Sequence, residues 1–109
     1  MITLKDIEKA HDRIRPFIHR TPILTNSSLN ELSGAELFFK CENFQKAGSF
    51  KIRGATNAVQ LLSEEDLKKG IATTSSGNHG AALSMAVTRR GGKTPVSYTH
   101  LTLPTSPHV

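Results

Sequence analysis

The sequence predicts an α/β fold in which helices alternate with parallel strands. Apolar residues recur at helical spacing in residues 4–14, 50–62 and 81–90, while residues 35–41 and 71–74 are short runs rich in aromatic or β-branched side chains. Because strands that alternate with helices usually pair in parallel, this order indicates a parallel sheet covered by helices. A chain of 109 residues suits one small domain.

The first helix is expected at residues 4–14. Thr3 and Asp6 have the spacing of a capping arrangement at its start. The helix then presents one apolar stripe, which consists of Leu4, Ile7, Ala10 and Ile14. Pro16 ends the pattern because proline cannot continue a helix without the loss of a backbone hydrogen bond.

Between the first helix and Cys41 the sequence predicts a link, a short helix and a strand. The Thr21-Pro22 pair starts an extended link. Residues 26–32 then form a short helix that stops at Gly34, and residues 35–41 form a strand.

The next segment predicts two helices in succession. Gly48-Ser49 opens a helix at Phe50, and its apolar stripe consists of Ile52, Ala55, Val59 and Leu62. Ser63 caps a further helical turn that runs to Lys69. Gly70 ends this second helix.

The last predicted elements are a strand and a helix joined by a turn. Residues 71–74 form the strand, and residues 75–80 form a turn that leads into a helix over residues 81–90. Residues 96–109 contain no Asp, Glu, Lys or Arg and show no clear helical or strand repeat after Tyr98. The composition therefore changes near the end of the chain.

Composition and charge argue against several classes of protein. With 37% hydrophobic and 21% charged residues, and no long apolar run, the chain is expected to be a globular protein without a membrane span. The net charge of +5 is scattered and only five Phe and one Tyr are present, so nucleic-acid binding is not expected. A lone Cys41 and a polar N-terminus favour the cytoplasm.

Lys51 is the first candidate for chemistry. It lies at the start of a predicted helix, directly after a glycine turn that lets other groups approach the backbone closely. Desolvation and the positive end of the helix dipole both favour the neutral amine, which is the form that makes a Schiff base with a carbonyl cofactor. Most lysines at helix starts are merely solvated, so this interpretation needs a second motif.

That second motif is the predicted turn at residues 74–80, Thr74-Ser75-Ser76-Gly77-Asn78-His79-Gly80. Its hydroxyls, amide and backbone N–H groups lie between a strand and a helix N-terminus, which is an environment that binds anions. The same residues could instead serve only as a helix cap and a turn.

Two other catalytic interpretations are weaker. Ser76 and His79 could form a hydrolase pair, but no Gly-x-Ser-x-Gly elbow surrounds Ser76 and the short separation does not set the geometry of a nucleophile and its base. No metal site is expected, because paired ligand spacing on one helix face is absent from the five histidines, His11, His19, His79, His100 and His108.

Taken together, two motifs closely resemble the pyridoxal-phosphate-dependent threonine/serine dehydratases and serine racemases. The first spans residues 40–55 and includes Gly48-Ser49-Phe50-Lys51-Ile52-Arg53-Gly54, and the second is Ser75-Ser76-Gly77-Asn78-His79-Gly80. The resemblance covers roughly residues 4–93. It implies a partial tryptophan-synthase-β-like fold (fold type II), in which a parallel sheet lies between two layers of helices.

The resemblance also implies roles for individual residues. Lys51 would hold pyridoxal 5'-phosphate through a Schiff base, with Phe50 beside the ring and Asn78 hydrogen-bonded to its 3-hydroxyl. The following loop would receive the substrate carboxylate through Ser75, Ser76, Gly77, Asn78 and His79. In racemases the residue that matches Ser76 exchanges a proton on the face opposite the lysine.

The implied reaction is the dehydration and deamination of L-threonine or L-serine to a 2-oxo acid and ammonia. Lys51 would take the α-proton, and the cofactor would serve as the electron sink. A serine racemase is the alternative within the family, since Ser76 is present. From a different class, a non-catalytic α/β module could use only the anion-binding turn.

The resemblance further implies that the chain is part of a longer, homo-oligomeric enzyme. Family members run to about three times this length, which exceeds one small domain. The additional part would supply the phosphate-binding loop, the partner of the pyridine nitrogen and the usual metal site, so the chain is expected to be inactive by itself. We assign residues 1–95 to the family domain, and residues 96–109, which resemble a translated sequencing adaptor, to an artefactual, disordered tail.

Overall fold

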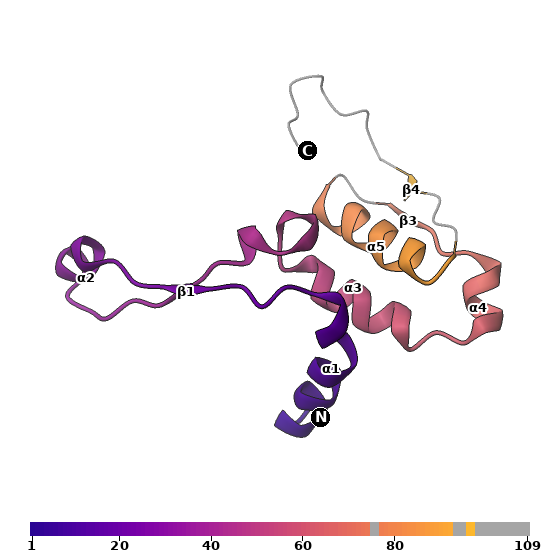
Figure 1. The fold of residues 1–109 in the computed structure, drawn as a ribbon, viewed down its shortest axis with the longest axis horizontal. Helices are drawn as coiled ribbons and strands as arrows, with labels where there is room; N and C mark the ends of the chain where they lie inside the picture. Colours follow the sequence, from indigo (N-terminus) through magenta and orange to yellow (C-terminus); the bar gives the residue numbers. More distant parts are fainter. Residues whose placement is uncertain (75–76, 93–95, 98–109) are drawn as a thin grey trace, which may run out of the picture.

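The computed structural model describes residues 1–74, 77–92 and 96–97. Its α-helices are α1 Leu4–Ile14, α2 Ser27–Ser33, α3 Lys51–Gln60, α4 Glu64–Lys69 and α5 Asn78–Arg89. Three 3-10 helices lie between them, η1 Arg15–Phe17, η2 Glu42–Phe44 and η3 Lys46–Gly48. The strands are β1 Ile23–Leu24, β2 Phe39–Lys40, β3 Thr73–Thr74 and β4 Val96–Ser97 (Figure 1).

The strands form two separate pairs. β3 and β4 are parallel, with Thr73 opposite Val96 and Thr74 opposite Ser97. Because α5 connects them, this segment is a β-α-β unit, and the predicted parallel pairing is confirmed here. β1 and β2 instead form an antiparallel pair. The strand expected at residues 35–41 is therefore shorter than predicted and belongs to a hairpin, because the short connection through α2 turns the chain back on itself.

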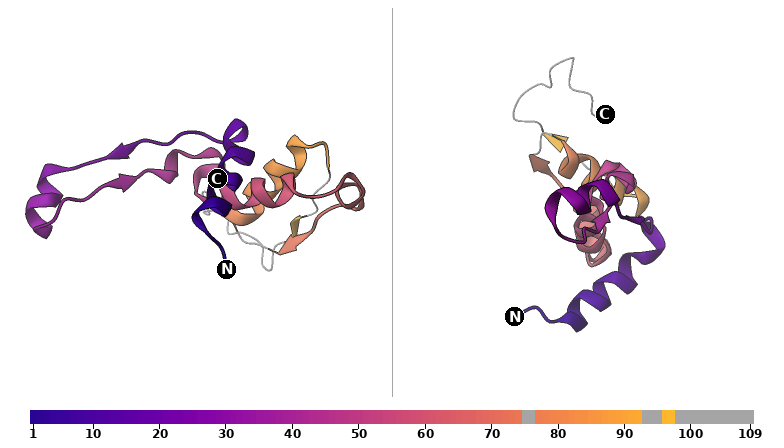
Figure 2. Two further views of the ribbon diagram at one scale, coloured as in Figure 1. Left: turned by 90° about the horizontal axis from the view of Figure 1, so that it is seen from below. Right: turned by 90° about the vertical axis from the view of Figure 1, so that its left-hand side faces the viewer.

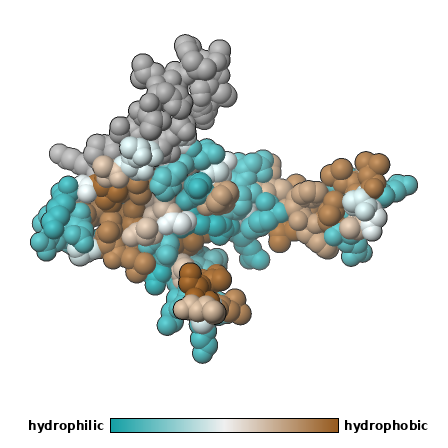
Figure 3. All heavy atoms as spheres, turned by 180° about the vertical axis from the view of Figure 1, so that it is seen from behind, coloured by the Kyte–Doolittle hydropathy of each residue, from teal (hydrophilic) through white to brown (hydrophobic). Residues whose placement is uncertain are grey.

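The hairpin is an arm that extends away from the helices. β1 and β2 run side by side along it, and α2 lies at its far end (Figures 1 and 2). Large apolar side chains are exposed along the arm, namely Ile23, Leu24, Leu29, Leu32, Phe38 and Phe39. Figure 3 shows their surface as a brown region at the end of the arm. The arm therefore has an apolar surface that the described residues leave open to solvent.

The core lies where α3 packs against α5. Its buried members are Ile52, Ala55, Val59, Leu67, Ala82, Leu83, Ala86 and Val87. Three of the four residues of the predicted apolar stripe on α3 are thus buried, and they face the apolar side of α5. Burial of each large side chain contributes about 1.5–3 kcal/mol, so this helix pair is the main source of stability among the described elements.

The apolar stripe expected on α1 behaves differently. Of its four members only Ile14 is buried, while Leu4 and Ile7 are 69% and 59% exposed. The physical reason is that α1 meets α3 through its C-terminal part, where Arg13 Nη1 donates a hydrogen bond to Asn57 Oδ1 at 2.6 Å. Its N-terminal half projects away from the core (Figure 1).

Local signals at the helix ends are confirmed. Thr3 and Asp6 form a capping box at the start of α1. Asn26 Oδ1 accepts a hydrogen bond from the Leu29 backbone at 2.9 Å, and Ser63 Oγ accepts one from the Asp66 backbone at 3.0 Å. Among the described residues, no helix combines the length and the apolar character that crossing a bilayer requires.

Candidate functional site

The candidate site is built on the N-terminal ends of two helices. α3 and α5 pack along each other and run in the same direction, and η3, which precedes α3, also lies against α5. Their first turns therefore lie at the same end of the helix pair (Figures 1 and 2). The first N–H groups of a helix lack partners within the helix and carry partial positive charge, so this end favours anions.

Lys51 is the first residue of α3 and its side chain is exposed. Its Nζ lies 5.5 Å from the centroid of the Phe50 ring, which is within the range of a cation–π contact. The desolvation expected for this amine is not observed, because Lys51 is exposed to solvent. The position at a helix N-terminus is confirmed.

The glycine turn before Lys51 is also confirmed. Gly48 has a φ of 77°, a left-handed conformation that glycine adopts without steric cost. Its neighbour Ala47 has a φ of 63°, which is uncommon for a residue with a Cβ. After this turn the Lys51 backbone N–H donates a hydrogen bond to Ser49 Oγ at 3.3 Å. The chain thus changes direction sharply just before the helix that carries the lysine.

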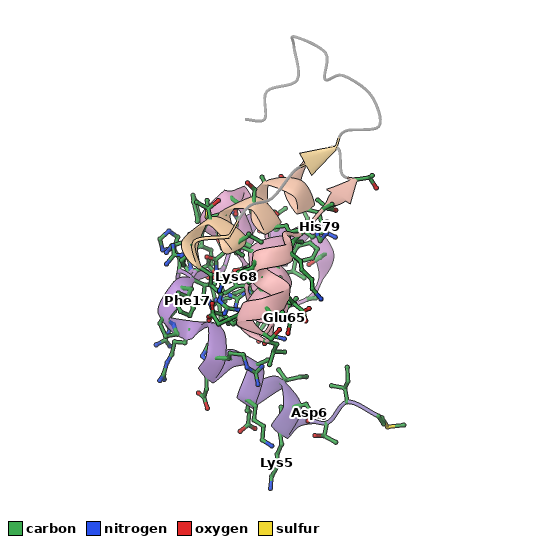
Figure 4. All side chains as sticks on the ribbon, turned by 90° about the vertical axis from the view of Figure 1, so that its right-hand side faces the viewer. Lys5, Asp6, Phe17, Glu65, Lys68 and His79 are labelled. Carbon is green, nitrogen blue, oxygen red and sulfur yellow. The ribbon has the colours of Figure 1, made fainter. Side chains whose placement is uncertain are left out.

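The second motif differs from its prediction in one respect. Asn78 and His79 were expected in a turn before a helix at residues 81–90, but they are the first two residues of α5, and both are exposed. Gly77 is the N-cap of α5. Figure 4 shows His79 at this end of α5. Ser75 and Ser76 lie outside the described residues.

The structure therefore brings Lys51, Asn78 and His79 to one end of the helix pair. The lysine supplies an amine that can act as a nucleophile or a base, and the first turn of α5 supplies amide and imidazole groups beside backbone N–H groups. This combination can bind a carboxylate and move a proton beside it. No group of three or more His, Cys, Asp or Glu side chains that could hold a metal ion occurs in the part of the chain described here.

A network of charged side chains lies next to this end of α3. Arg53 contacts both carboxylate oxygens of Glu42, with Nε 2.5 Å from Oε1 and Nη2 3.1 Å from Oε2. Thr21 Oγ1 donates to Glu42 Oε2 at 2.5 Å. These hydrogen bonds, with that of Arg53 first, lower the pKa of Glu42 to about 2, although burial acts in the opposite direction.

The effect on Arg53 is reciprocal. The hydrogen bond to Glu42 raises the pKa of Arg53, against the opposing effect of burial. Both groups are therefore charged over the whole ordinary pH range. This pair could not be predicted from the sequence, because an acid in one loop and a base in a later helix have no fixed geometry until the chain folds.

A cleft of about 730 Å³ adjoins this network. Phe50 and Arg53 belong to its lining, and most of the other polar lining is basic or imidazole, namely His11, Arg15, His19, Arg20 and Lys40. Glu42 is the acidic residue of the lining, and it is already paired with Arg53. The surface beside Phe50 is therefore electropositive, which adds to the attraction of anions to this end of α3.

Comparison with known proteins gives a consistent result. A family described as pyridoxal-phosphate dependent enzyme matches residues 14–100. A serine racemase from Dictyostelium discoideum is 66% identical over 85 residues, which cover 78% of this chain and 26% of the relative. A beta-hydroxyaspartate dehydratase from Paracoccus denitrificans is 60% identical over 89 residues, which cover 82% of this chain and 28% of the relative.

A solved structure agrees with these relatives. The crystal structure of a T.th. threonine deaminase superposes with a TM-score of 0.78 at 36% identity, over 89% of this chain and 38% of that one. The predicted fold, part of the tryptophan-synthase-β-like fold type II, is therefore confirmed. The chain spans roughly a quarter of the length of the curated relatives it matches, so its two strand pairs are a portion of the complete architecture.

Proposed function

Because the chain belongs to the family of pyridoxal-phosphate dependent enzymes, we propose that the whole protein acts on the α-carbon of a small amino acid in the manner of a serine racemase. The 66% identity to a serine racemase carries this proposal. It reverses the order expected from the sequence, which put threonine and serine dehydration first and racemisation second. The sequence motifs are common to racemases and dehydratases, so they could not show which of the two activities to expect first.

The residues at the N-terminal ends of α3 and α5 fit such a cofactor. Lys51 offers an exposed primary amine, and the Phe50 ring beside it offers an apolar face. Asn78 would contribute a side-chain amide from the first turn of α5. When bound, pyridoxal phosphate would supply an electron sink that stabilises negative charge at the α-carbon of the amino acid.

The substrate carboxylate would be bound by the start of α5. Asn78, His79 and the backbone N–H groups of the first turn present hydrogen-bond donors and partial positive charge, which match a carboxylate. Ser75, Ser76 and Gly77 would complete this loop. Carboxylate binding would hold the α-carbon at a fixed place relative to the Lys51 amine.

Lys51 would then remove the α-proton from one face of the amino acid. Return of a proton to the opposite face inverts the configuration, and we assign that exchange to the Ser76 hydroxyl, as the resemblance implies. Loss of the β-hydroxyl instead of reprotonation gives a 2-oxo acid and ammonia after hydrolysis. Both activities would thus begin with removal of the α-proton by Lys51, and they would differ in the next step.

Dehydration remains the second candidate on a specific observation. A dehydratase is 60% identical to the chain, and a threonine deaminase has the same fold over 89% of it. Both reactions begin from a β-hydroxy amino acid. L-serine is therefore the substrate that tests both.

The test uses the protein expressed from source DNA whose reading frame has been resequenced from codon 90 onward. The purified protein is incubated with pyridoxal phosphate and L-serine, and D-serine is measured by chiral chromatography while the 2-oxo acid is measured by its hydrazone. We expect D-serine to form, and we expect Lys51→Ala to abolish it.

Each other result has a defined meaning. Formation of the 2-oxo acid without D-serine would replace racemisation by dehydration. Absence of both products, together with absence of a Lys51-dependent absorption band from the bound cofactor, would favour a non-catalytic anion-binding module.

A further inference from the structure

The Glu42–Arg53 pair connects two parts of the chain that meet beside Lys51. Glu42 begins η2, directly after the arm, and Arg53 lies in the first turn of α3, two residues after Lys51. The guanidinium contacts both carboxylate oxygens, an arrangement that restricts rotation as well as distance. The base of the arm is thus joined to the turn of helix that carries the candidate amine.

Two further hydrogen bonds extend this connection across both sides of the arm. Thr21, which precedes β1, donates from Oγ1 to Glu42, and Lys40 of β2 donates from Nζ to the backbone O of Thr21 at 2.7 Å. Thr21 is only 4% exposed, and the side chains of Glu42 and Arg53 are 16% and 31% exposed. The network is therefore partly shielded from water and is screened less than a surface ion pair.

The start of α3 depends on such tertiary contacts, because its local capping is weak. Its N-cap, Phe50, makes no side-chain hydrogen bond to the helix. The two residues with left-handed backbone, Ala47 and Gly48, precede it within a short distance along the chain. The local side-chain hydrogen bond at this start is the one from the Lys51 N–H to Ser49 Oγ at 3.3 Å. The direction of the first turn therefore also depends on what holds its side chains: Ile52 is buried in the core, and Arg53 is held by Glu42.

We propose that Glu42 and Arg53 are positioning residues for Lys51, which orient the first turn of α3 so that the amine meets the carbonyl group of the cofactor. The inference rests on the proposed function. Neither residue has to touch the cofactor for this role. The low pKa of Glu42, about 2, supports it, because the carboxylate stays ionised at every pH at which the amine reacts.

The inference is tested by the selectivity of one chemical reaction. The Lys51 amine adds to the aldehyde of pyridoxal phosphate, and loss of one water forms a C=N bond. Borohydride then delivers a hydride to its carbon, and solvent supplies the proton to nitrogen, which leaves a stable secondary amine. Peptide mass spectrometry measures the labelled fraction of Lys51 relative to that of Lys68.

Lys68 is a suitable internal reference. It is an exposed lysine on α4, labelled in Figure 4. α4 follows the C-terminal end of α3 (Figure 1), whereas Lys51 is the first residue of α3. The labelling of Lys68 reports the reactivity of an unselected lysine in the same sample. Differences in cofactor concentration, reductant and recovery therefore cancel in the ratio.

We expect the native chain to label Lys51 in preference to Lys68, and Glu42→Gln to lower the ratio roughly tenfold, as expected when a charge-assisted, bidentate contact is lost. Arg53→Lys keeps the positive charge but loses the planar guanidinium that contacts both carboxylate oxygens. Its labelling ratio should therefore lie between those of the native chain and of Glu42→Gln. Glu64→Gln breaks the ion pair between Arg90 and Glu64 on the far side of the helices and should leave the ratio unchanged.

Circular dichroism and thermal unfolding separate positioning from loss of fold. If Glu42→Gln unfolds the chain, Thr21→Val and Arg53→Lys take its place, and an unchanged ratio in both would overturn the inference. A native preference for Lys51 that survives Glu42→Gln in a folded chain would also overturn it, while the proposed function would stand. Absence of any preference for Lys51 in the native chain would overturn the proposed function and this inference together.

Discussion

Arg90 donates a hydrogen bond from Nη1 to the backbone O of Val59 at 2.6 Å, so that the end of α5 is joined to the end of α3. The same Nη1 donates to the backbone O of Leu62 at 2.9 Å. Val59 lies in the last turn of α3 and Leu62 lies two residues after its end, a region where helix carbonyls carry partial negative charge. One guanidinium therefore donates to two carbonyls and links the two helices that form the core.

Replacement of Arg90 should destabilise the fold. Arg90→Met keeps much of the apolar stem but removes both hydrogen bonds, and we expect the free energy of unfolding to fall by about 1–3 kcal/mol. Urea denaturation measures the change. Glu64→Gln is the matched control, because Glu64 contacts the same guanidinium but its side chain is 78% exposed, and its loss should cost at most about 1 kcal/mol. Equal losses of unfolding free energy in the two variants would contradict a stabilising role of the hydrogen bonds from Arg90 to Val59 and Leu62.

The Glu42–Arg53 pair should make stability depend on acid. The pKa of Glu42 is lowered in the folded chain to about 2 from its ordinary 4.5, so its contribution is complete above pH 4.5 and disappears as the pH falls toward 2. Denaturation curves at a series of pH values should therefore show a loss of stability through this window. Glu42→Gln should remove that part of the slope, and a slope that persists unchanged would exclude Glu42 as its source.

The two glycines around Lys51 should respond in opposite ways to alanine. Gly48→Ala places a Cβ on a residue with a φ of 77°, and we expect it to cost about 1–2 kcal/mol of stability. Gly54→Ala lies inside α3, where an added Cβ meets nothing within 4 Å, and it should stabilise the helix by about 0.5–1 kcal/mol. Thermal unfolding compares the two variants directly, and a gain in stability for Gly48→Ala would contradict the left-handed turn.

Truncation of apolar side chains should separate the core from the arm. Ile52 is 1% exposed between α3 and α5, so Ile52→Ala should cost about 2–5 kcal/mol and unfold much of a chain this small. Leu32, in α2 at the far end of the arm, is 83% exposed, and Leu32→Ala should change stability by less than about 0.5 kcal/mol. Comparable losses at the two positions would mean that the arm is packed in solution.

Much of the local structure follows from neighbouring residues, which is why it could be predicted. The Thr3–Asp6 capping box, the Ser63 cap and the left-handed Gly48 all depend on the conformation of a few adjacent residues. Helical spacing places Ile52 and Val59 on one apolar side of α3, and both are buried. Similarly, the motif around Lys51 predicted the family that the comparisons show.

Other features needed contacts between distant segments. The same helical spacing in α1 did not lead to burial of Leu4 and Ile7, because spacing defines an apolar side but not what covers it. The predicted strand before Cys41 became half of an antiparallel hairpin, because strand direction depends on the path of the connection. The assignment of residues 96–109 to a separate tail remains a prediction. The structure describes the first two residues of that segment as β4, and residues 98–109 lie outside the described residues.

For the site itself, the sequence by itself determined which chemical groups are present: the amine of Lys51 at a helix start, and the donors of Asn78 and His79 at another. Only the tertiary structure decided that the two helix starts lie at the same end of the α3–α5 pair, and that Arg53 meets Glu42 beside them. The physical reason is the distance along the chain over which the determining interactions act. Helix starts and turns depend on residues close in the chain, whereas the meeting of two helices depends on apolar side chains far apart in sequence that share one core.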